Sequence, residues 1–189
     1  MKITSPLTEE VARSLKAGDK VELSGIIVTA RDAAHKHLVE NRPENVPLKL
    51  DGGAIYHCGP VVRDEKVVAA GPTTSIREEA YEADVIKKYG VRAVIGKGGM
   101  GEKTLKALCD FGAVYLSAVG GAAQVIAKSV EEIVGVHMLE EFGEPEAFWV
   151  LRVKNLPLIV SMDSHGRSLY KDVEESSGRK LGEILGVKA

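Results

Sequence analysis

Three cationic side chains stand at junctions where a short apolar run gives way to a helical pattern. Arg77 ends the segment Gly71-Pro72-Thr73-Thr74-Ser75-Ile76-Arg77, Lys97 lies within Gly96-Lys97-Gly98-Gly99-Met100-Gly101, and Arg31 follows a third apolar run. A strand, a tight loop and a helix in that order point the N–H groups and the partial positive charge of the helix N-terminus away from the sheet. Full positive charges at the same place predict a binding site for a small, doubly anionic ligand.

Two adjacent hydroxyls, those of Thr73 and Thr74, belong to the first glycine segment. One of them is expected to cap the following helix, which leaves the other to hydrogen-bond a ligand. Arg77 falls in the first turn of that helix, where a cation opposes the helix dipole by up to about 1 kcal/mol. It should therefore have either a bound ligand or an acidic partner, for which Glu78 and Glu79 are the neighbouring candidates.

The second glycine segment also approaches a phosphate-binding P-loop, since the stretch from Gly96 to Thr104 is a variant of Lys-Gly-Gly-x-Gly-Lys-Thr. Glu102, however, is inserted before Lys103. The insertion puts a carboxylate where such a loop presents lysine to phosphate, and it displaces the threonine that would hold magnesium. The sequence therefore argues against nucleotide hydrolysis. Nothing structural requires Lys97 inside a glycine loop, so a ligand is the better reason for it.

Further polar groups surround the third junction. Asp32 and His35 are spaced as an i, i+3 pair on a helix that also carries His37, an arrangement that is often an inert surface cluster. We predict no metal site, because the other histidines and the cysteines show no ligand spacing: His57, His137, His165, Cys58 and Cys109. Cys109 falls on the apolar face of a helical pattern, which favours a core position.

Bulk composition limits the class of protein. The chain has 189 residues, of which 44% are hydrophobic and 28% charged, so one globular domain over residues 1–189 is expected. A net charge of -2 does not indicate a basic surface that would bind nucleic acid. No apolar run approaches the roughly 20 residues needed to cross a membrane. The first residues also lack a signal-peptide pattern, so we expect a cytoplasmic location.

Alternating elements predict an α/β fold with a mixed sheet. We expect strands over 20–29, 54–59, 113–119, 147–153 and 156–162, and a hairpin over 61–70. We expect helices over 8–16, 30–41, 122–134 and 173–185, and one after each glycine segment. The residues from Ser75 to Glu78 have the spacing of a capping box at the start of a helix that Gly90 ends.

Taken together, the three junctions resemble the β subunit of class I fumarases and L-tartrate dehydratases, the iron–sulfur hydro-lyases. The resemblance rests on Thr29-Ala30-Arg31-Asp32-Ala33-Ala34-His35 and on the two glycine segments. All three occur in the family's order, and the likeness covers nearly the whole chain. It implies a swivelling β/β/α domain, comparable to the mobile C-terminal domain of aconitase-like enzymes.

The resemblance also implies a division of labour within a hetero-oligomer. In this family a [4Fe–4S] cluster is held by three cysteines of a separate α subunit, and the β portion closes over it and binds the substrate carboxylates. By matching positions, Arg31, Arg77 and Lys97 would bind a C4 dicarboxylate, and Thr73 would stand near the carbon that loses its proton. Asp32 and His35 would support the loop that contains Arg31, or would take part in proton transfer.

Several reactions remain open from the sequence. The favoured one is the reversible hydration of fumarate to malate, a step of the tricarboxylic acid cycle. Dehydration of L-tartrate to oxaloacetate is the nearest alternative, because both substrates need the same carboxylate contacts. A non-catalytic dicarboxylate-binding or assembly module is a more distant alternative, and an NTPase is the most distant.

Overall fold

A computed structural model describes residues 1–41 and 50–186 of the chain. Arg42 and Pro43, which the sequence suggests as the end of the helix expected over 30–41, lie outside the described residues. The strands are β1 (Lys2–Ser5), β2 (Lys20–Thr29), β3 (Ala54–Tyr56), β4 (Val61–Arg63), β5 (Lys66–Ala69), β6 (Ala93–Gly96), β7 (Val114–Ser117), β8 (Val130–His137) and β9 (Phe148–Met162). The helical elements are α1 (Glu9–Ser14), α2 (Asp32–Glu40), the 3-10 turn η1 (Ser75–Glu78), α3 (Glu82–Tyr89), α4 (Glu102–Phe111), α5 (Ala123–Ala127), α6 (Leu139–Phe142) and α7 (Leu169–Leu185).

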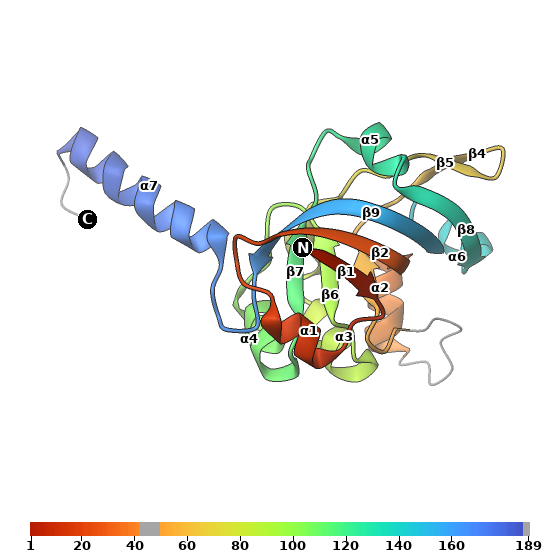
Figure 1. Ribbon diagram of the computed structural model, residues 1–189, viewed down its shortest axis with the longest axis horizontal. Coiled ribbons are helices and arrows are strands. Elements are labelled where there is room, and N and C mark those ends of the chain that lie inside the picture. The colour runs from red at the N-terminus through yellow and green to blue at the C-terminus, as the bar shows by residue number, and fades with distance from the viewer. Residues whose placement is uncertain (42–49, 187–189) are drawn as a thin grey trace.

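The predicted mixed sheet is confirmed. Seven of the described strands form it in the order β1-β2-β3-β6-β7-β9-β8, and the first five are parallel to their neighbours. The long strand β9 is antiparallel to β7 and also to β2, so that β2, β3, β6, β7 and β9 close into a ring (Figure 1). β4 and β5 form the expected separate hairpin.

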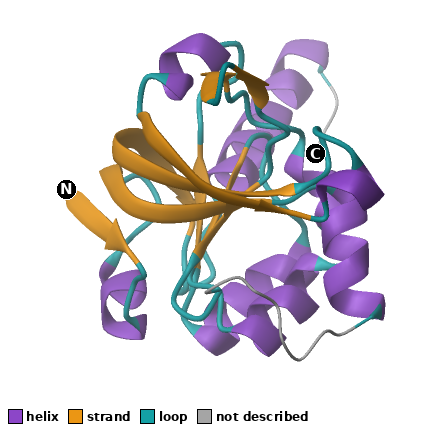
Figure 2. Ribbon diagram, turned by 90° about the vertical axis from the view of Figure 1, so that its right-hand side faces the viewer, coloured by secondary structure: helices purple, strands orange, loops and turns teal. Residues whose placement is uncertain are grey.

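Alternate residues of the parallel strands face two different cores. On β6, Ile95 belongs to the core enclosed by the ring, whereas Val94 faces the layer of α2, α3 and α4. That layer contributes Leu38, Val85 and Leu108, all completely buried. Figure 2 shows the curved main sheet with helices packed along its side. This β/β/α layering agrees with the predicted fold class.

The helix expected over 122–134 is wrong beyond its first turn and a half. α5 ends at Ala127, and β8 then pairs antiparallel with β9. The spacing of Val130, Ile133 and Val134 fits a helical face as well as a strand, but these residues are β-branched and meet a long partner strand. The distant pairing with β9 therefore decides the structure of this segment.

The two last strands, expected over 147–153 and 156–162, are one strand. β9 continues through Asn155, which adopts a left-handed conformation (φ 50°), and the pairing with β2 shifts register opposite this point. A bulge thus bends β9 without ending it. The C-terminal helix α7 begins four residues earlier than expected and projects from the body of the molecule (Figure 1).

The expected capping box does not form. Residues 75–78 are a 3-10 turn, and the α-helix begins only at Glu82, although Gly90 does end it in the left-handed conformation (φ 67°). Neither Thr74 nor Ser75 caps through its side chain; Ser75 instead hydrogen-bonds within the core. At the N-terminal helix, by contrast, the hydroxyl of Thr8 caps α1 by accepting a hydrogen bond from the Val11 N–H. No helix in the described part of the chain is long and apolar enough to cross a membrane.

Candidate functional site

The three junctions meet at one edge of the sheet. Because β2, β3 and β6 are parallel, their carboxyl ends lie together, and the chain runs from them into Arg31, His57 and Lys97 respectively. The segment with Thr73 is joined to this edge by backbone hydrogen bonds: the Thr73 N–H donates to the His57 carbonyl at 2.7 Å, and the Ser75 N–H to the Lys97 carbonyl at 3.0 Å. The three sequence segments that carry Arg31, Arg77 and Lys97 therefore lie next to one another at the carboxyl ends of the parallel strands.

Arg77 does have an acidic partner, but it is neither of its two sequence neighbours. Its guanidinium forms an ion pair with Asp32 at the start of α2. Both side chains are substantially exposed, at 51% for Arg77 and 38% for Asp32. The pair therefore joins the first and third junctions at the protein surface, and a guanidinium in this position keeps donors available for a second anion.

The expectation of open helix N-termini is corrected for both α2 and α4. At α2, Glu146 accepts a hydrogen bond from the Ala33 N–H at 3.0 Å, and its other oxygen lies 3.3 Å from the Arg31 guanidinium. The chain's own carboxylate thus satisfies the helix end. Arg31 is accordingly held against the segment before β9, with one guanidinium nitrogen 3.5 Å from the Pro145 carbonyl.

At α4, Glu79 takes the place that a phosphate would need. Its carboxylate accepts hydrogen bonds from the backbone N–H groups of Gly101, Lys103 and Thr104 at 2.7, 3.0 and 3.2 Å, and from the Thr104 hydroxyl at 2.7 Å. Together with the inserted Glu102, this internal cap removes the donors of a P-loop. The occupied N-terminus of α4 thus also argues against nucleotide binding at this loop.

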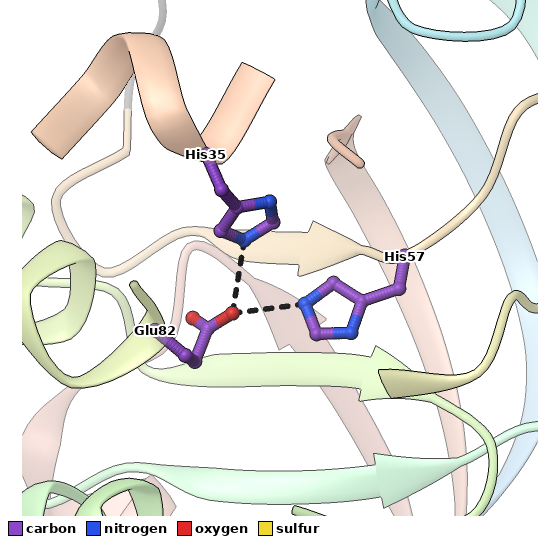
Figure 3. A group of neighbouring side chains, drawn as sticks. All are labelled: His35, His57 and Glu82. Atoms are coloured by element: carbon purple, nitrogen blue, oxygen red, sulfur yellow. Dashed lines mark hydrogen bonds and ion pairs between the residues drawn. The ribbon is translucent and has the colours of Figure 1, made fainter. Parts of the chain in front are cut away.

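A buried cluster lies below this edge, formed by His35 of α2, His57 after β3 and Glu82 of α3 (Figure 3). Oxygen Oε2 of Glu82 lies 2.9 Å from Nε2 of His35 and 2.9 Å from Nε2 of His57. All three side chains are completely buried. The alternative that His35 belongs to an inert surface cluster is therefore excluded, since its buried ring binds Glu82, whereas Asp32 pairs with Arg77.

Charge and burial act in opposition on this cluster. Burial disfavours the charge on His35, but the charge and hydrogen bond of Glu82 and the charge of Glu78 together raise its pKa. Burial also acts to raise the pKa of Glu82, yet the charges and hydrogen bonds of the two histidines leave it well below its usual value. At His57 burial dominates, and its pKa is lowered. The cluster is an ion pair with a neutral second histidine.

Gly96 of the second glycine segment is explained by this cluster. A Cβ at this position would collide with the Ser75 hydroxyl and would come within 3.2 Å of Nδ1 of His57. The Ser75 hydroxyl lies 2.8 Å from that nitrogen and accepts a hydrogen bond from the Tyr115 hydroxyl, also at 2.8 Å. Only glycine permits so close an approach of strand β6.

Metal binding would use the same atoms. His35, His57 and Glu82 each offer a ligand atom within 4.8 Å of the others, a grouping that sequence spacing did not reveal. Both Nε2 atoms already make hydrogen bonds to one carboxylate oxygen, and both Nδ1 atoms have acceptor or hydroxyl partners. We therefore assign these residues a hydrogen-bonding role.

One signal could have indicated the cluster. Glu78, Glu82 and Ile86 follow one another at intervals of four, and all three are buried. Acidic residues in line with the apolar side of a helical pattern are unusual, because a buried carboxylate needs a partner. Such a pattern predicts a buried cationic or donor group, although the sequence does not say which one.

Glu78 leads to a prediction about stability. Burial raises the pKa of its carboxyl, the charge of His35 lowers it and Asp32 raises it, to about 7 overall. The folded chain therefore holds this proton more tightly than the unfolded chain, so the contribution of Glu78 to stability falls as pH rises from about 4.5 to 7. Glu78→Gln should accordingly stabilise the chain at pH 8 by about 3 kcal/mol relative to wild type, with little effect at pH 4.5.

Thermal melting of both proteins across this pH range measures the difference. Glu174→Gln, on the exposed face of α7, is the matched control and should follow the wild type at every pH. A difference between Glu78→Gln and wild type that stays constant from pH 4.5 to 8 would mean that Glu78 has an ordinary pKa.

Comparison with known proteins identifies a family and several relatives of this chain. A family model described as "Fumarase C-terminus" matches residues 1–173. A protein of Geobacillus stearothermophilus that carries the name fumarate hydratase class I is 55% identical over 187 residues; the match covers 96% of this chain but 36% of that protein. This chain therefore spans about a third of the length of that relative.

Two further relatives match over most of their length. A Methanocaldococcus jannaschii protein named as an L(+)-tartrate dehydratase subunit beta is 45% identical over 188 residues, with 96% of each chain covered. The L(+)-tartrate dehydratase subunit beta of Escherichia coli K12 is 43% identical over 189 residues, with 97% of this chain and 92% of that protein covered.

Proposed function

This chain belongs to the Fumarase C-terminus family, and we propose that it is the β subunit of a heteromeric hydro-lyase that acts on a C4 dicarboxylate. The observation that carries the proposal is the meeting of three cation-bearing junctions at one edge of the sheet. The favoured reaction is the reversible addition of water to fumarate, which gives malate. The α subunit would complete the site.

Arg31, Arg77 and Lys97 would bind the two carboxylates of the substrate. Arg77 is the most accessible of them, and its contact with Asp32 leaves further guanidinium donors for a substrate carboxylate. Lys97 is half-buried between Thr74, with which it forms an isolated parallel bridge, and Gly120. The planar guanidinium of Arg77 and the ammonium group of Lys97 would thus approach the substrate from neighbouring loops.

Thr73 would act in proton transfer. Its backbone is fixed by the hydrogen bond to the His57 carbonyl, and the residue is half-buried. A threonine hydroxyl is a weak base by itself, so it needs assistance from a neighbouring base, which we assign to the α subunit. Asp32 would position Arg77 through their ion pair. His35 would support the loop that contains Arg31, because its Nδ1 lies 3.0 Å from the Arg31 carbonyl oxygen.

The iron–sulfur cluster would belong to the α subunit and would there supply Lewis-acid chemistry. This chain's own residues do not fit such a group. It has two cysteines, and Cys58 is buried with its thiol pKa raised by burial to about 12. Cys109 is half-buried rather than in the core as expected, and its thiol pKa is also raised by burial. Neither side chain favours the thiolate that iron requires.

L-tartrate is the second candidate substrate. It is supported by the names of the two relatives that match this chain along most of their length. Fumarate is supported by the name of the relative with 55% identity. The substrates of the two reactions present the same pair of carboxylates, so the cationic residues of this chain would serve both, and the α subunit would distinguish the hydroxyl groups.

Arg77→Ala tests the carboxylate contacts. A charge-assisted hydrogen bond is worth about 1.5–3 kcal/mol, so its loss should weaken substrate binding by roughly 10- to 150-fold in the assembled enzyme. Arg77→Lys should recover only part of this loss, because an ammonium group lacks the planar fork. The measurement is the KM for fumarate and for L-tartrate by steady-state kinetics.

Arg152→Ala is the matched control, because Arg152 is a half-exposed arginine on β9 that also pairs with one carboxylate, Glu132, at 2.9 Å. It should leave KM unchanged. If Arg77→Ala behaves like this control, Arg77 does not contact the substrate.

A further inference from the structure

An unbroken series of hydrogen bonds runs beneath the three junctions. It begins at the Tyr115 hydroxyl, which donates to the Ser75 hydroxyl at 2.8 Å. The Ser75 hydroxyl has then one hydrogen left, and it lies 2.8 Å from Nδ1 of His57. The series continues through Nε2 of His57 to Glu82 and on to His35, and it ends at the Arg31 carbonyl.

The direction of these bonds fixes where the protons are. Glu82 is ionised and can only accept, so the proton of the neutral His57 ring is on Nε2 and points to Oε2 of Glu82. Nδ1 of His57 is then an acceptor, and the Ser75 hydroxyl, which accepts from Tyr115, donates its own hydrogen to it. Both nitrogens of His35 face acceptors, Oε2 of Glu82 and the Arg31 carbonyl, so this ring carries two protons and a positive charge.

Three members of the series contact a residue of the proposed site through the backbone. His35 binds the Arg31 carbonyl at 3.0 Å. His57 accepts at its carbonyl from the Thr73 N–H at 2.7 Å. Ser75 donates its own N–H to the Lys97 carbonyl at 3.0 Å. Glu82 is the centre of the series, because its single oxygen Oε2 joins the two histidines.

We propose that Glu82 is a positioning residue, which holds Arg31, Thr73 and Lys97 in the geometry needed for the reaction through its charged bond to His35 and its neutral bond to His57. This inference rests on the proposed function. A buried ion pair adds little to stability by comparison with packed apolar groups, but it does specify one arrangement of its partners. Three loops from distant parts of the sequence need such a specification, and a backbone hydrogen bond links each of them to a member of the series.

Other ionisable groups face this series and are part of its electrostatics. Asp32 acts on His57 and on Glu78, and Glu78 lies with Oε2 3.7 Å from Nδ1 of His35. The ionisable groups that meet here are Asp32 and His35 from α2, His57 after β3, Glu78 from η1, Glu82 from α3 and Tyr115 from β7. In this set His35 is the cation and Glu82 its direct counter-ion.

Nitrogen NMR of the histidine rings tests the proton positions in the full chain. At pH 7 we expect one doubly protonated ring, His35, and one neutral ring with its proton on Nε2, His57. Glu82→Gln should convert His35 to a neutral ring. A neutral His35 in the wild-type chain would overturn the proposal. So would zinc bound to the chain after purification, with both Nε2 atoms deprotonated, because the residues would then be metal ligands.

Steady-state kinetics of the complex with its α subunit tests the positioning role. Glu82→Gln should lower kcat by about 100-fold, because a displacement of about 1 Å in a reacting group can cost this much. Glu82→Asp keeps the charge and should restore part of the loss. Wild-type kcat in a folded Glu82→Gln complex, with a lower melting temperature alone, would overturn the proposal; if this variant does not fold, the NMR of the wild-type chain decides.

Asp163→Asn is the matched control for a buried carboxylate. Asp163 is 2% exposed and accepts hydrogen bonds from the backbone N–H groups of Ala17, His165 and Arg167, none of which belongs to the series. This change should lower the melting temperature and leave kcat unchanged. If the wild-type complex acts on neither fumarate nor L-tartrate, the proposed function fails, whereas the protonation of His35 remains an independent result about the cluster.

Discussion

Thr73→Val should lower the turnover number of the assembled enzyme by about 100-fold or more and leave KM nearly unchanged. The substitution keeps the shape of the side chain and removes only the hydroxyl. It also keeps the backbone hydrogen bond from Thr73 to the His57 carbonyl, so the loop retains its main-chain anchor. A loss confined to kcat would therefore report the hydroxyl itself.

Thr74→Val is the matched control, since Thr74 is the adjacent threonine and is exposed, and its side chain makes no capping hydrogen bond to η1. It should leave both kinetic parameters close to those of the wild type. Thermal melting of each variant separates a folding effect from a catalytic one. Normal turnover in Thr73→Val with a lowered melting temperature would return Thr73 to a structural role and would favour a non-catalytic binding module.

Local signals were sufficient for much of the fold. The cap at Thr8, the hairpin of β4 and β5 and the stop at Gly90 all follow from residues within one turn of the feature that they determine. The meeting of the three junctions also follows from the sequence, because parallel strands bring their carboxyl ends to one edge. The stretch after Ala127 was not predictable in this way, since its partner β9 is distant in sequence.

The electrostatics of the site depended on contacts of long sequence separation. Glu146 reaches α2 from more than one hundred residues away, and Glu79 reaches α4 across the intervening helix α3 and strand β6. His35, His57 and Glu82 come from three different elements. No local pattern indicates which carboxylate meets which cation, so the sequence predicted that the cation-bearing junctions meet but not the internal partners of their side chains.

The proposed function also predicts that activity requires two polypeptides. We expect this chain alone to hydrate no fumarate and to dehydrate no L-tartrate, because its two cysteines cannot ligate a [4Fe–4S] cluster and its cationic loops supply only part of the site. Addition of an α subunit that carries the cluster should produce activity from two inactive components. The expected contrast is all or none, and therefore larger than the effect of any single substitution.

The most direct test is an anaerobic activity assay of the separate and the mixed subunits after treatment with iron and sulfide. The proposed function requires that the mixture converts fumarate or L-tartrate, that this chain alone does not, and that this chain alone shows no cluster absorbance. Turnover of either substrate by this polypeptide alone, or cluster absorbance in its isolated solution, would contradict the proposal.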